Sequence, residues 1–333
     1  MTGKRYPDPL DLEAQQRAEA AEIAVAQIWV DHPPQRIILV QLMKYLRVCK
    51  QSRGKPLNGR RLSEESQAGK SSTIERMKFE LAEEDRAAGR EVNPYRLLHI
   101  TIDRRMTLKM LYQEILHRMA DEFIEASGSR FRTGDERDRL IKGKFHDNIK
   151  VLEQRIAEWV PRLGVEAIVV DEVQHLHRSS DDASEVTKKL QAFLDRGVVP
   201  LVFVGDETSR GFFDCNPQFA ARLMRPLELQ PLEERSRSQR KLFKDFCANF
   251  DRLIVEAGLT PIPSRLDDER MLDGLIAASG GHVGRVARLL QIALPSALER
   301  GAASVELYDL ANAVDDYAIG LGWIDYNPFL QRA

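Results

Sequence analysis

The sequence predicts an α/β protein in which a parallel sheet of five strands is flanked by helices and followed by a small helical C-terminal domain. Three short runs rich in isoleucine, valine and leucine, at residues 97–102, 167–170 and 198–204, have the composition of strands that are buried on both faces. Helical patterns separate the runs, as expected for βαβ units whose parallel strands bind ligands beyond their carboxyl ends. After Pro231 the strand signals fade and helical patterns take over.

The remaining elements follow from local patterns. Apolar residues at helical spacing predict helices at 10–28 and 35–48, with a break between them at His32, Pro33 and Pro34. A short polar strand is expected at 58–62 and another strand at 226–229, which brings the number of strands to five. Further helical patterns, bounded by proline, glycine and polar residues, cover residues 106–124, 145–159, 236–256, 266–278, 283–298 and 307–317.

The composition excludes several classes of protein. Hydrophobic residues make up 43% and charged residues 30% of the 333 positions, which is ordinary for a globular chain and argues against a disordered or fibrous one. No apolar stretch is long enough to span a membrane, and the first twenty residues lack the apolar core of a signal peptide. Cys49, Cys215 and Cys247 are too far apart for a disulfide framework or a CxxC metal site. A cytoplasmic protein is therefore expected.

Basic and acidic residues are nearly balanced, at 49 and 51, so the total charge does not indicate a nucleic-acid partner. Two local clusters of basic residues stand out. Residues 44–61 contain seven basic side chains and no acidic one, and a second cluster covers 235–244. Such clusters are usually solvated surfaces, which is the alternative to a binding role for both.

The most informative motif is a phosphate-binding loop. In such a loop the backbone N–H groups and the following helix N-terminus surround the phosphates, a lysine reaches the β- and γ-phosphate oxygens, and the next hydroxyl holds magnesium. Lys70 and Ser71 would take those two roles. Glu64 stands where the motif has its first glycine, so a helix N-terminus capped by serines and without a ligand is the alternative. The predicted nucleotide-binding residues are Ser66, Gln67, Ala68, Gly69, Lys70, Ser71 and Ser72.

A second motif strengthens the first. The apolar run at 167–170 ends in Asp171 and Glu172. A buried parallel strand would deliver Asp171 at its carboxyl end, where it can bind magnesium through water, while Glu172 can polarise a water that attacks the γ-phosphate. Magnesium suits this site because it prefers hard oxygen ligands, here Ser71 and Asp171, together with substrate phosphates. The alternative is two acids at an ordinary strand end.

Three further residues are candidates for sensing or stabilising the γ-phosphate. Asp206 follows the run at 198–204, and Arg222 and Arg225 precede the expected strand at 226–229. A planar guanidinium with fixed donors can stabilise charge on a transferring phosphoryl group, including that of a neighbouring subunit. A surface ion pair is the ordinary alternative for either arginine.

Taken in this order, the motifs resemble those of AAA+ ATPases. Three shorter features narrow the resemblance to the transposon-encoded ATPases of the TniB and TnsC type: the tryptophan and prolines within residues 28–36, the form of the loop at 65–70, and the ending Asn327-Pro328-Phe329. The similarity covers about residues 22–330. It implies an N-terminal helical extension at 1–34, an AAA+ nucleotide-binding domain at 35–232, and a helical lid domain with a tail at 233–333.

The resemblance also implies a function and residue roles. It implies an ATP- and Mg²⁺-dependent regulator of DNA transposition that forms a homo-oligomeric ring or filament on duplex DNA and links a target-selecting protein to the transposase. Asp206 stands where the family usually has an uncharged polar sensor, which together with Glu64 predicts slow hydrolysis. The roles carried over are Walker A for Lys70 and Ser71, Walker B for Asp171 and Glu172, arginine finger for Arg222 with Arg225 as its competitor, and second sensor for Arg285.

DNA contacts come from the same resemblance, which implies that residues just after the second strand line a central pore. Those residues are Arg104, Arg105, Thr107 and Lys109. Contacts of this kind track phosphates and carry little sequence information, and repetition around an oligomer would multiply a small local excess of charge. The alternative is that these side chains cap a helix or pair with nearby acids.

Two other functions stay open at this stage. The first is a protein scaffold locked by a nucleotide that it hardly hydrolyses. The second is another AAA+ DNA machine, such as a replication initiator or a helicase loader. A winged-helix domain after the helical lid would favour the second, and no convincing β-hairpin follows Tyr317.

Overall fold

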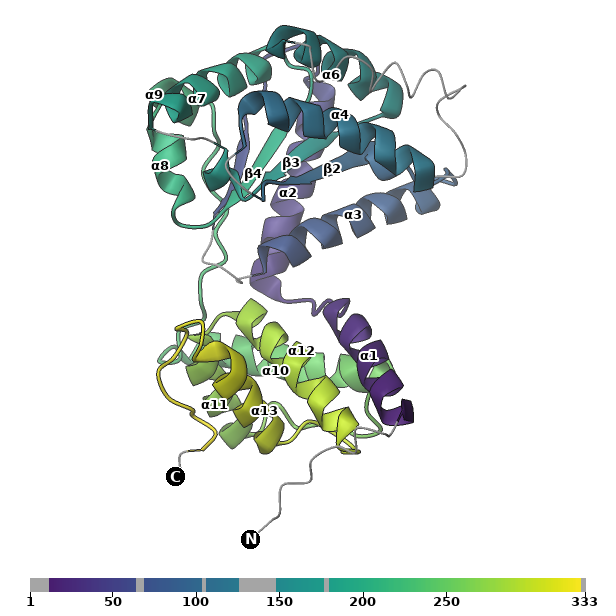
Figure 1. Ribbon diagram of the computed structural model, residues 1–333, viewed down its shortest axis with the longest axis vertical. Coiled ribbons are helices and arrows are strands. Elements are labelled where there is room, and N and C mark those ends of the chain that lie inside the picture. Colours follow the sequence, from purple (N-terminus) through teal and green to yellow (C-terminus); the bar gives the residue numbers. More distant parts are fainter. Residues whose placement is uncertain (1–11, 64–68, 104–105, 126–147, 177–179, 331–333) are drawn as a thin grey trace. The chain divides into compact units, whose positions relative to one another are not determined.

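The structure is a computed structural model that describes residues 12–63, 69–103, 106–125, 148–176 and 180–330 (Figure 1). The chain divides into two units. One is an α/β unit of residues 37–66 and 70–228, and the other is a helical unit of residues 1–36, 67–69 and 229–333. Within the described segments, no helix combines the length and apolar character needed to cross a lipid bilayer.

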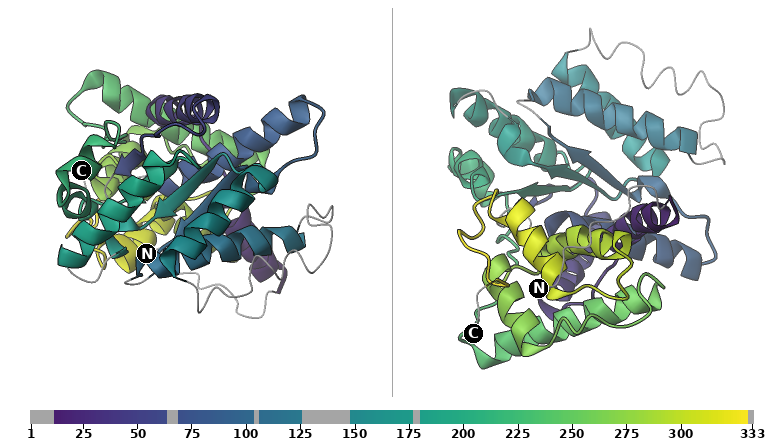
Figure 2. Two further views of the ribbon diagram at one scale, coloured as in Figure 1. Left: turned by 90° about the horizontal axis from the view of Figure 1, so that it is seen from above. Right: turned by 60° about the horizontal axis from the view of Figure 1, so that its bottom comes forward.

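Parallel strands form the sheet of the α/β unit. They are β1 (Arg60–Ser63), β2 (Leu97–Thr101), β3 (Ala167–Asp171) and β4 (Leu201–Gly205), arranged in the order β1-β4-β3-β2. All residues of β3 and β4 are buried, as expected for central strands that are covered by helices on both faces (Figure 2). Because every pairing is parallel, the carboxyl ends of all these strands lie at the same edge.

Among the described residues the sheet has four strands rather than the five predicted. The segment at 226–229, expected to form the fifth strand, makes one isolated bridge, between Leu62 and Leu227, and a second bridge joins Gly59 to Leu223 just before this segment. Pro226 lies between the two bridges, and since proline has no N–H donor, a continuous ladder cannot form there. The N–H of Leu227 still donates to the carbonyl of Arg61 at 2.9 Å, which keeps the segment beside β1.

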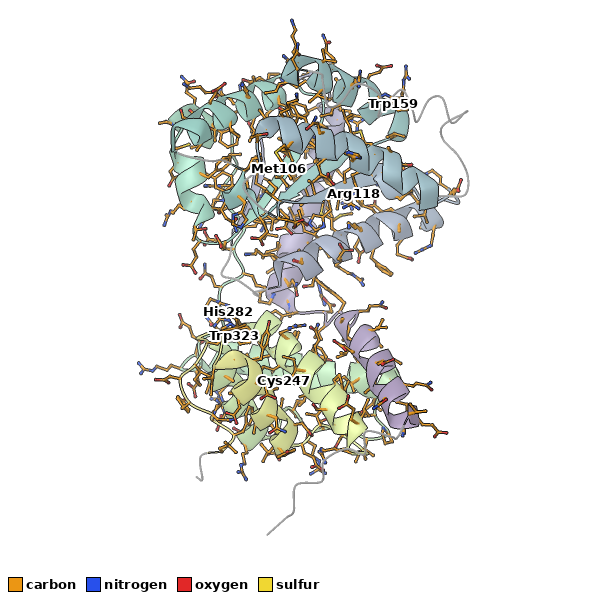
Figure 3. All side chains as sticks on the ribbon, in the orientation of Figure 1. Met106, Arg118, Trp159, Cys247, His282 and Trp323 are labelled. Atoms are coloured by element: carbon orange, nitrogen blue, oxygen red, sulfur yellow. The ribbon has the colours of Figure 1, made fainter. Side chains whose placement is uncertain are left out.

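Helix α6 begins and ends where the local sequence supplies caps. The side chain of Asn148 accepts a hydrogen bond from the N–H of Val151 at the start of α6, and Gly164 ends the helix in the left-handed conformation. Trp159 on α6 is labelled in Figure 3. The helices of the α/β unit are α2 (Pro33–Gln51), α3 (Lys70–Ala87), α4 (Leu108–Glu125), α6 (Ile149–Leu163), α7 (Ser180–Asp195), α8 (Ser209–Asp214) and α9 (Pro217–Ala221).

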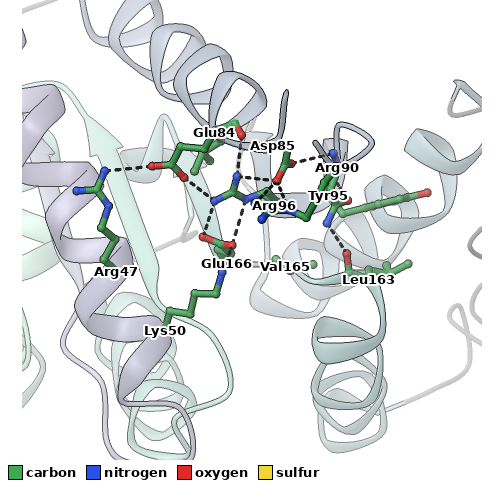
Figure 4. A network of polar contacts seen from close by, with 12 residues as sticks. Arg47, Lys50, Glu84, Asp85, Arg90, Tyr95, Arg96, Leu163, Val165 and Glu166 are labelled. Atoms are coloured by element: carbon green, nitrogen blue, oxygen red, sulfur yellow. Dashed lines mark hydrogen bonds and ion pairs between the residues drawn. The ribbon is translucent and has the colours of Figure 1, made fainter. Parts of the chain in front are cut away.

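A buried ionic network lies next to β2, at the amino end of that strand. Its centre is Arg96, which belongs to the 3₁₀ turn η1 (Pro94–Arg96) and forms ion pairs with Glu84, Asp85 and Glu166. Figure 4 shows the guanidinium surrounded by these three carboxylates. The network joins α3, η1 and the residue that precedes β3 by one position.

The helical unit contains α1 (Leu12–Ala26), α10 (Arg237–Glu256), α11 (Glu269–Ser279), α12 (Val283–Glu299), α13 (Leu307–Ala313) and the π-helical turn η3 (Val314–Ala318). Helix α1 packs along α12, although the two are far apart in the sequence. Cys247 on α10 lies inside this unit (Figure 3).

The Asn327-Pro328-Phe329 segment is anchored in the helical unit. The amide of Asn327 donates to the carbonyl of Ala311 at 2.8 Å and to Asp315 at 2.7 Å. The ring of Phe329 packs against Gly274, where an added Cβ would lie 2.2 Å from a ring carbon. A glycine is therefore required at 274 for the aromatic ring to fit.

Candidate functional site

The candidate site lies at the carboxyl edge of the sheet. Strand β1 ends at Ser63, and α3 begins at Lys70. Strand β4 lies between β1 and β3, so the end of β4 at Gly205 is flanked in the sheet by the ends of β1 and β3, at Ser63 and Asp171. The topology thus brings the lysine motif and the acidic motif to one edge, at the position where doubly wound sheets bind ligands.

Lys70 is buried at the first position of α3, and its ammonium donates a hydrogen bond of 3.1 Å to the carbonyl of Gly205. Gly69 precedes it with a φ of +110°, a conformation that side chains other than glycine rarely adopt. The amide of Gln35 donates to the carbonyl of Gly69 at 3.2 Å.

Asp171 is buried at the end of β3, and both of its carboxylate oxygens accept hydrogen bonds. Oδ1 accepts from the N–H of Glu172 at 2.9 Å, and Oδ2 lies 3.0 Å from Nε2 of His99 on β2. Nδ1 of the same histidine lies 3.6 Å from the carboxylate of Glu75 on α3. His99 therefore lies between two carboxylates and fixes the orientation of Asp171.

The electrostatics of this trio follow from its geometry. Burial disfavours the charged form of His99, but its hydrogen bond to Asp171 and its contact with the Glu75 carboxylate outweigh burial and raise the pKa of the histidine. The contact with His99 in turn lowers the pKa of Glu75 to about 2. His99 did not emerge from the sequence as a site residue, although a single histidine within the apolar run at 97–102 was an available signal.

Glu172 adopts a conformation that is rare for its residue type. Its backbone is left-handed, with φ 58° and ψ 40°, which is strained for a residue other than glycine. The amide of Gln174 donates to Oε2 of Glu172 at 2.6 Å and holds the carboxylate in place. An added Cβ at Gly205 would lie 3.0 Å from Oε1 of Gln174 and 2.7 Å from Cβ of Ser209, so this corner requires glycine.

Asp206 is engaged by its own turn. Its Oδ1 accepts hydrogen bonds from the N–H of Thr208 at 2.8 Å and from the Thr208 hydroxyl at 2.5 Å, and its carbonyl accepts from the Ser209 hydroxyl at 2.6 Å. These bonds organise the start of α8. Asp206 therefore has a local structural role in this fold.

The two arginine candidates differ in their partners. Arg222 forms an ion pair of 2.5 Å with Asp195 on α7. Arg225 is exposed and makes no hydrogen bond or ion pair with any residue in the described parts of the chain. Arg222 is thus held by a residue of the same chain, whereas Arg225 is exposed to solvent.

The other predicted site residues lie on α3, on or just before α4, or outside the described residues. Ser66, Gln67, Ala68, Arg104 and Arg105 lie outside the described residues. Ser71 and Ser72 are exposed in the first turn of α3. The hydroxyl of Thr107 accepts from the N–H of Met110 at the start of α4, and Lys109 is half-buried on that helix.

Arg285 belongs to the helical unit. It lies on α12, where its guanidinium donates to the carbonyl of Ser279 at 3.4 Å and lies over the ring of Trp323, 5.2 Å from the ring centre.

The residues at the sheet edge suit a magnesium–nucleotide complex. An ammonium at the N-terminus of a helix is a phosphate-binding element, and an exposed serine hydroxyl with an aspartate carboxylate supplies the hard oxygen ligands that magnesium prefers. The chain offers both: Lys70 starts α3, Ser71 follows it, and Asp171 ends β3. Within the described residues, no cluster of three or more histidine, cysteine or acidic side chains could hold a metal ion.

Comparison with known proteins defines the fold. Residues 65–212 match the family model described as an AAA domain. The structure is similar to Cdc6p from Pyrobaculum aerophilum, with 15% identity, a TM-score of 0.54, and coverage of 87% of this chain and 68% of that chain. It is also similar to the ORC2 protein of Aeropyrum pernix in its ADPNP–ADP complexes, with 13% identity, a TM-score of 0.52, and coverage of 94% and 71%.

A third similar structure is a Walker-type ATPase of Pyrococcus abyssi, with 16% identity, a TM-score of 0.51, and coverage of 84% of this chain and 72% of that chain. No curated protein sequence matches the chain. The fold is therefore an α/β P-loop AAA+ fold, with a parallel sheet flanked by helices.

Proposed function

We propose that this protein binds ATP with Mg²⁺, hydrolyses it slowly, and uses the bound nucleotide to assemble on duplex DNA as a regulator of DNA transposition. The observation that carries the proposal is the meeting of Lys70 with Asp171 and Glu172 at one edge of the AAA+ sheet, on either side of β4. Residues 35–232 would be the nucleotide-binding domain, 233–333 the lid domain and tail, and 1–34 the N-terminal extension.

Each residue at the edge has a proposed task. Lys70 binds the β- and γ-phosphates, in exchange for its bond to the Gly205 carbonyl. Ser71 and Asp171 hold the metal, which neutralises charge on the phosphates when it is bound. Glu172 accepts a proton from the attacking water. The remaining proposed nucleotide contacts are Ser66, Gln67, Ala68, Gly69 and Ser72.

His99 and Gln174 act as positioning residues in this proposal. The imidazole of His99 keeps the Asp171 carboxylate in one orientation, and the amide of Gln174 does the same for Glu172. Gln174 occupies one oxygen of Glu172, which would have to be released before that oxygen accepts a proton. This bond, like the extra carboxylate of Asp206, supports slow rather than fast turnover.

Oligomerisation would complete the site. Of the two arginine candidates, Arg225 is the better finger because it is exposed and Arg222 would first have to leave Asp195. Arg285 would serve as the second sensor from the helical unit. Homo-oligomers, duplex DNA, the transposase and a target-selecting protein are the proposed partners, with Arg104, Arg105, Thr107 and Lys109 as the DNA-contacting residues.

A second candidate function is that of another AAA+ DNA machine, such as a replication initiator. It is supported by the likeness in fold to Cdc6p and ORC2. The two candidates share nucleotide-dependent DNA binding and differ in the protein partner. Stimulation of a transposase from the same transposon would distinguish them.

The test combines phosphate release with binding to duplex DNA, measured with ATP, a nonhydrolysable analogue, ADP and no nucleotide. Tight DNA binding is expected only with ATP or the analogue. Lys70→Ala should abolish nucleotide binding, because the phosphates lose their nearest positive charge. Glu172→Gln should keep nucleotide and DNA binding while slowing phosphate release by about 100-fold or more, as expected for loss of a general base.

The matched control is Glu207→Gln, which neutralises an exposed carboxylate just beyond the end of β4. It should leave phosphate release and DNA binding close to those of the wild type. DNA binding that does not depend on nucleotide would contradict the proposed function. Phosphate release at the wild-type rate in Glu172→Gln would contradict the role of Glu172 as the base.

A further inference from the structure

A cavity of about 430 Å³ lies between α2, the segment at 56–60 and Met224. All of its lining residues belong to the α/β unit, and none is among the proposed nucleotide-binding residues. Its volume is within the range of cavities that bind small molecules. The wall is fixed by Tyr45, whose hydroxyl donates to the carbonyl of Asn58 at 2.5 Å and thereby ties α2 to the segment before β1.

Arg60 is a buried cation of this cavity, and no ion pair joins it to a carboxylate of the described residues. It begins β1, lines the cavity, and is only 7% exposed. Its Nη2 donates to Oε1 of Gln41 at 2.8 Å, and its Nε is buried with no hydrogen-bond partner in the part of the chain that the structure describes. A buried guanidinium is ordinarily paired with a carboxylate, because removing its charge from water is costly.

The other charge in the lining has the same sign. Lys44 on α2 is exposed and forms no ion pair with the described residues, and the lining contains no aspartate or glutamate. The neighbouring cations of α2 are used elsewhere: Arg47 pairs with Glu84 and Lys50 with Glu166. The cavity therefore holds two positive charges with no neutralising group from the described residues.

The rest of the lining is largely apolar. Val48 is 54% exposed and Met224 is 39% exposed, while Leu57 is buried behind them. Exposed apolar side chains beside a cavity favour a ligand that covers them. A ligand that satisfies both features has one negative group and an apolar body.

We infer that this cavity binds a small organic carboxylate, with Arg60 as its counter-ion, Lys44 at its rim, and the apolar body of the ligand against Val48 and Met224. A carboxylate can accept hydrogen bonds from a guanidinium through two oxygens, which a neutral ligand of the same shape cannot do. The inference does not depend on nucleotide binding.

The experiment is calorimetric titration of the full-length protein with three probes: octanoate, acetate and 1-octanol. Octanoate carries both the charge and the apolar body, acetate has the charge with little apolar body, and 1-octanol has only the body. Octanoate should bind saturably with one site per chain. Acetate and 1-octanol should each bind with an affinity at least about tenfold lower than that of octanoate, because each lacks one of the two interactions.

Substitutions inside and outside the cavity test whether octanoate binds there. Arg60→Met should reduce the octanoate affinity about tenfold or more, to that of 1-octanol. Arg47→Met is the matched control, since it removes a cation from the same helix but from a side chain paired with Glu84, and it should keep the wild-type affinity. Lys70→Ala should also keep it, which separates this cavity from the proposed nucleotide site.

A second variant tests the inference even if Arg60→Met does not fold. Lys44→Glu changes an exposed residue and puts a negative charge at the rim, so it should weaken octanoate and leave 1-octanol unchanged. The inference is overturned if the wild type shows no saturable octanoate binding or binds 1-octanol as tightly. It is also overturned if folded Arg60→Met, or Lys44→Glu, keeps the full octanoate affinity.

Discussion

Two arginines at the amino ends of the outer strands of the four-stranded sheet are buried to the same degree but differ in their partners. Arg60 begins β1 and is 7% exposed, and Arg96 directly precedes β2 and is 6% exposed. Arg96 contacts three carboxylates at 2.8 to 3.2 Å (Figure 4). Arg60 contacts one neutral amide, that of Gln41. Burial alone therefore does not distinguish a structural arginine from one that needs a ligand.

The pKa directions of the two residues follow this difference. Burial opposes the charge of Arg96, but its carboxylates outweigh burial and raise the pKa of this guanidinium. Burial lowers the pKa of Arg60, and the nearby Tyr45 only partly opposes that shift. Arginine keeps its proton at any ordinary pH, so Arg60 cannot avoid the cost of burial by becoming neutral. It can avoid that cost only by gaining an anion.

The largest effect expected from this comparison is on the paired arginine. Arg96→Met should lower the free energy of unfolding by about 3 kcal/mol, because it removes the shared partner of the buried carboxylates of Asp85 and Glu166 and leaves each of them with a single exposed cation. Denaturation in urea measures the loss. The matched control is Arg90→Met, whose side chain is 60% exposed and also pairs with Asp85; its cost should be below about 1 kcal/mol. Equal losses in the two variants would show that the network is not stabilised through Arg96.

A buried histidine offers the next test, because a histidine can lose its proton and become neutral, whereas an arginine cannot. His32 is 2% exposed, and its Nδ1 has no hydrogen-bond partner within the described parts of the protein. Burial lowers the pKa of His32 from 6.5 to about 4. The folded state then binds its proton less readily than the unfolded state, so the stabilisation is complete above pH 6.5 and is lost as the pH falls toward 4.

Between pH 7 and pH 4.5 this histidine should account for roughly 2 to 3 kcal/mol of lost stability. His32→Phe keeps a ring beside Phe246, which the histidine contacts edge-on, and removes the titration. The variant should lose less stability than the wild type over this pH interval, measured by urea denaturation at both pH values. Parallel losses in the two proteins would mean that His32 is already charged or becomes exposed.

The central part of the fold could be predicted because it depends on local composition. Strands buried on both faces need continuous apolar runs, and β2 and β3 end within one residue of the prediction. Prolines account for two of the differences: β4 begins at Leu201, after Pro200, rather than at 198, and Pro226 reduces the fifth strand to an isolated bridge. A missing N–H matters only when a neighbouring strand is in place to accept from it, and the sequence alone does not show this.

The places of the candidate residues on helices and strands were predictable where a motif fixes them, and not where a tertiary contact decides. Parallel strands explain why Lys70 and Asp171 reach one edge. His99 contacts Asp171, which is 72 residues away in the sequence, and Gln174 contacts Glu172 across a left-handed backbone turn. No spacing rule indicates either contact. Arg60 was one of seven basic residues in the cluster at 44–61. Only the fold separates those that have carboxylate partners from Arg60, which has none among the described residues.

The smallest effect on the free energy of unfolding is expected for the arginine without a carboxylate partner among the described residues. Arg60→Met should leave the free energy of unfolding within about 1 kcal/mol of the wild type or raise it, because an apolar chain of similar length replaces an unpaired guanidinium and only the bond to Gln41 is lost. Urea denaturation with and without octanoate measures both consequences: the acid should stabilise the wild type, since it binds the folded state, but not the variant. A loss in Arg60→Met as large as that in Arg96→Met would mean that the chain itself supplies an anion to Arg60. The two arginines would then be equivalent, and the cavity would have no need of a ligand.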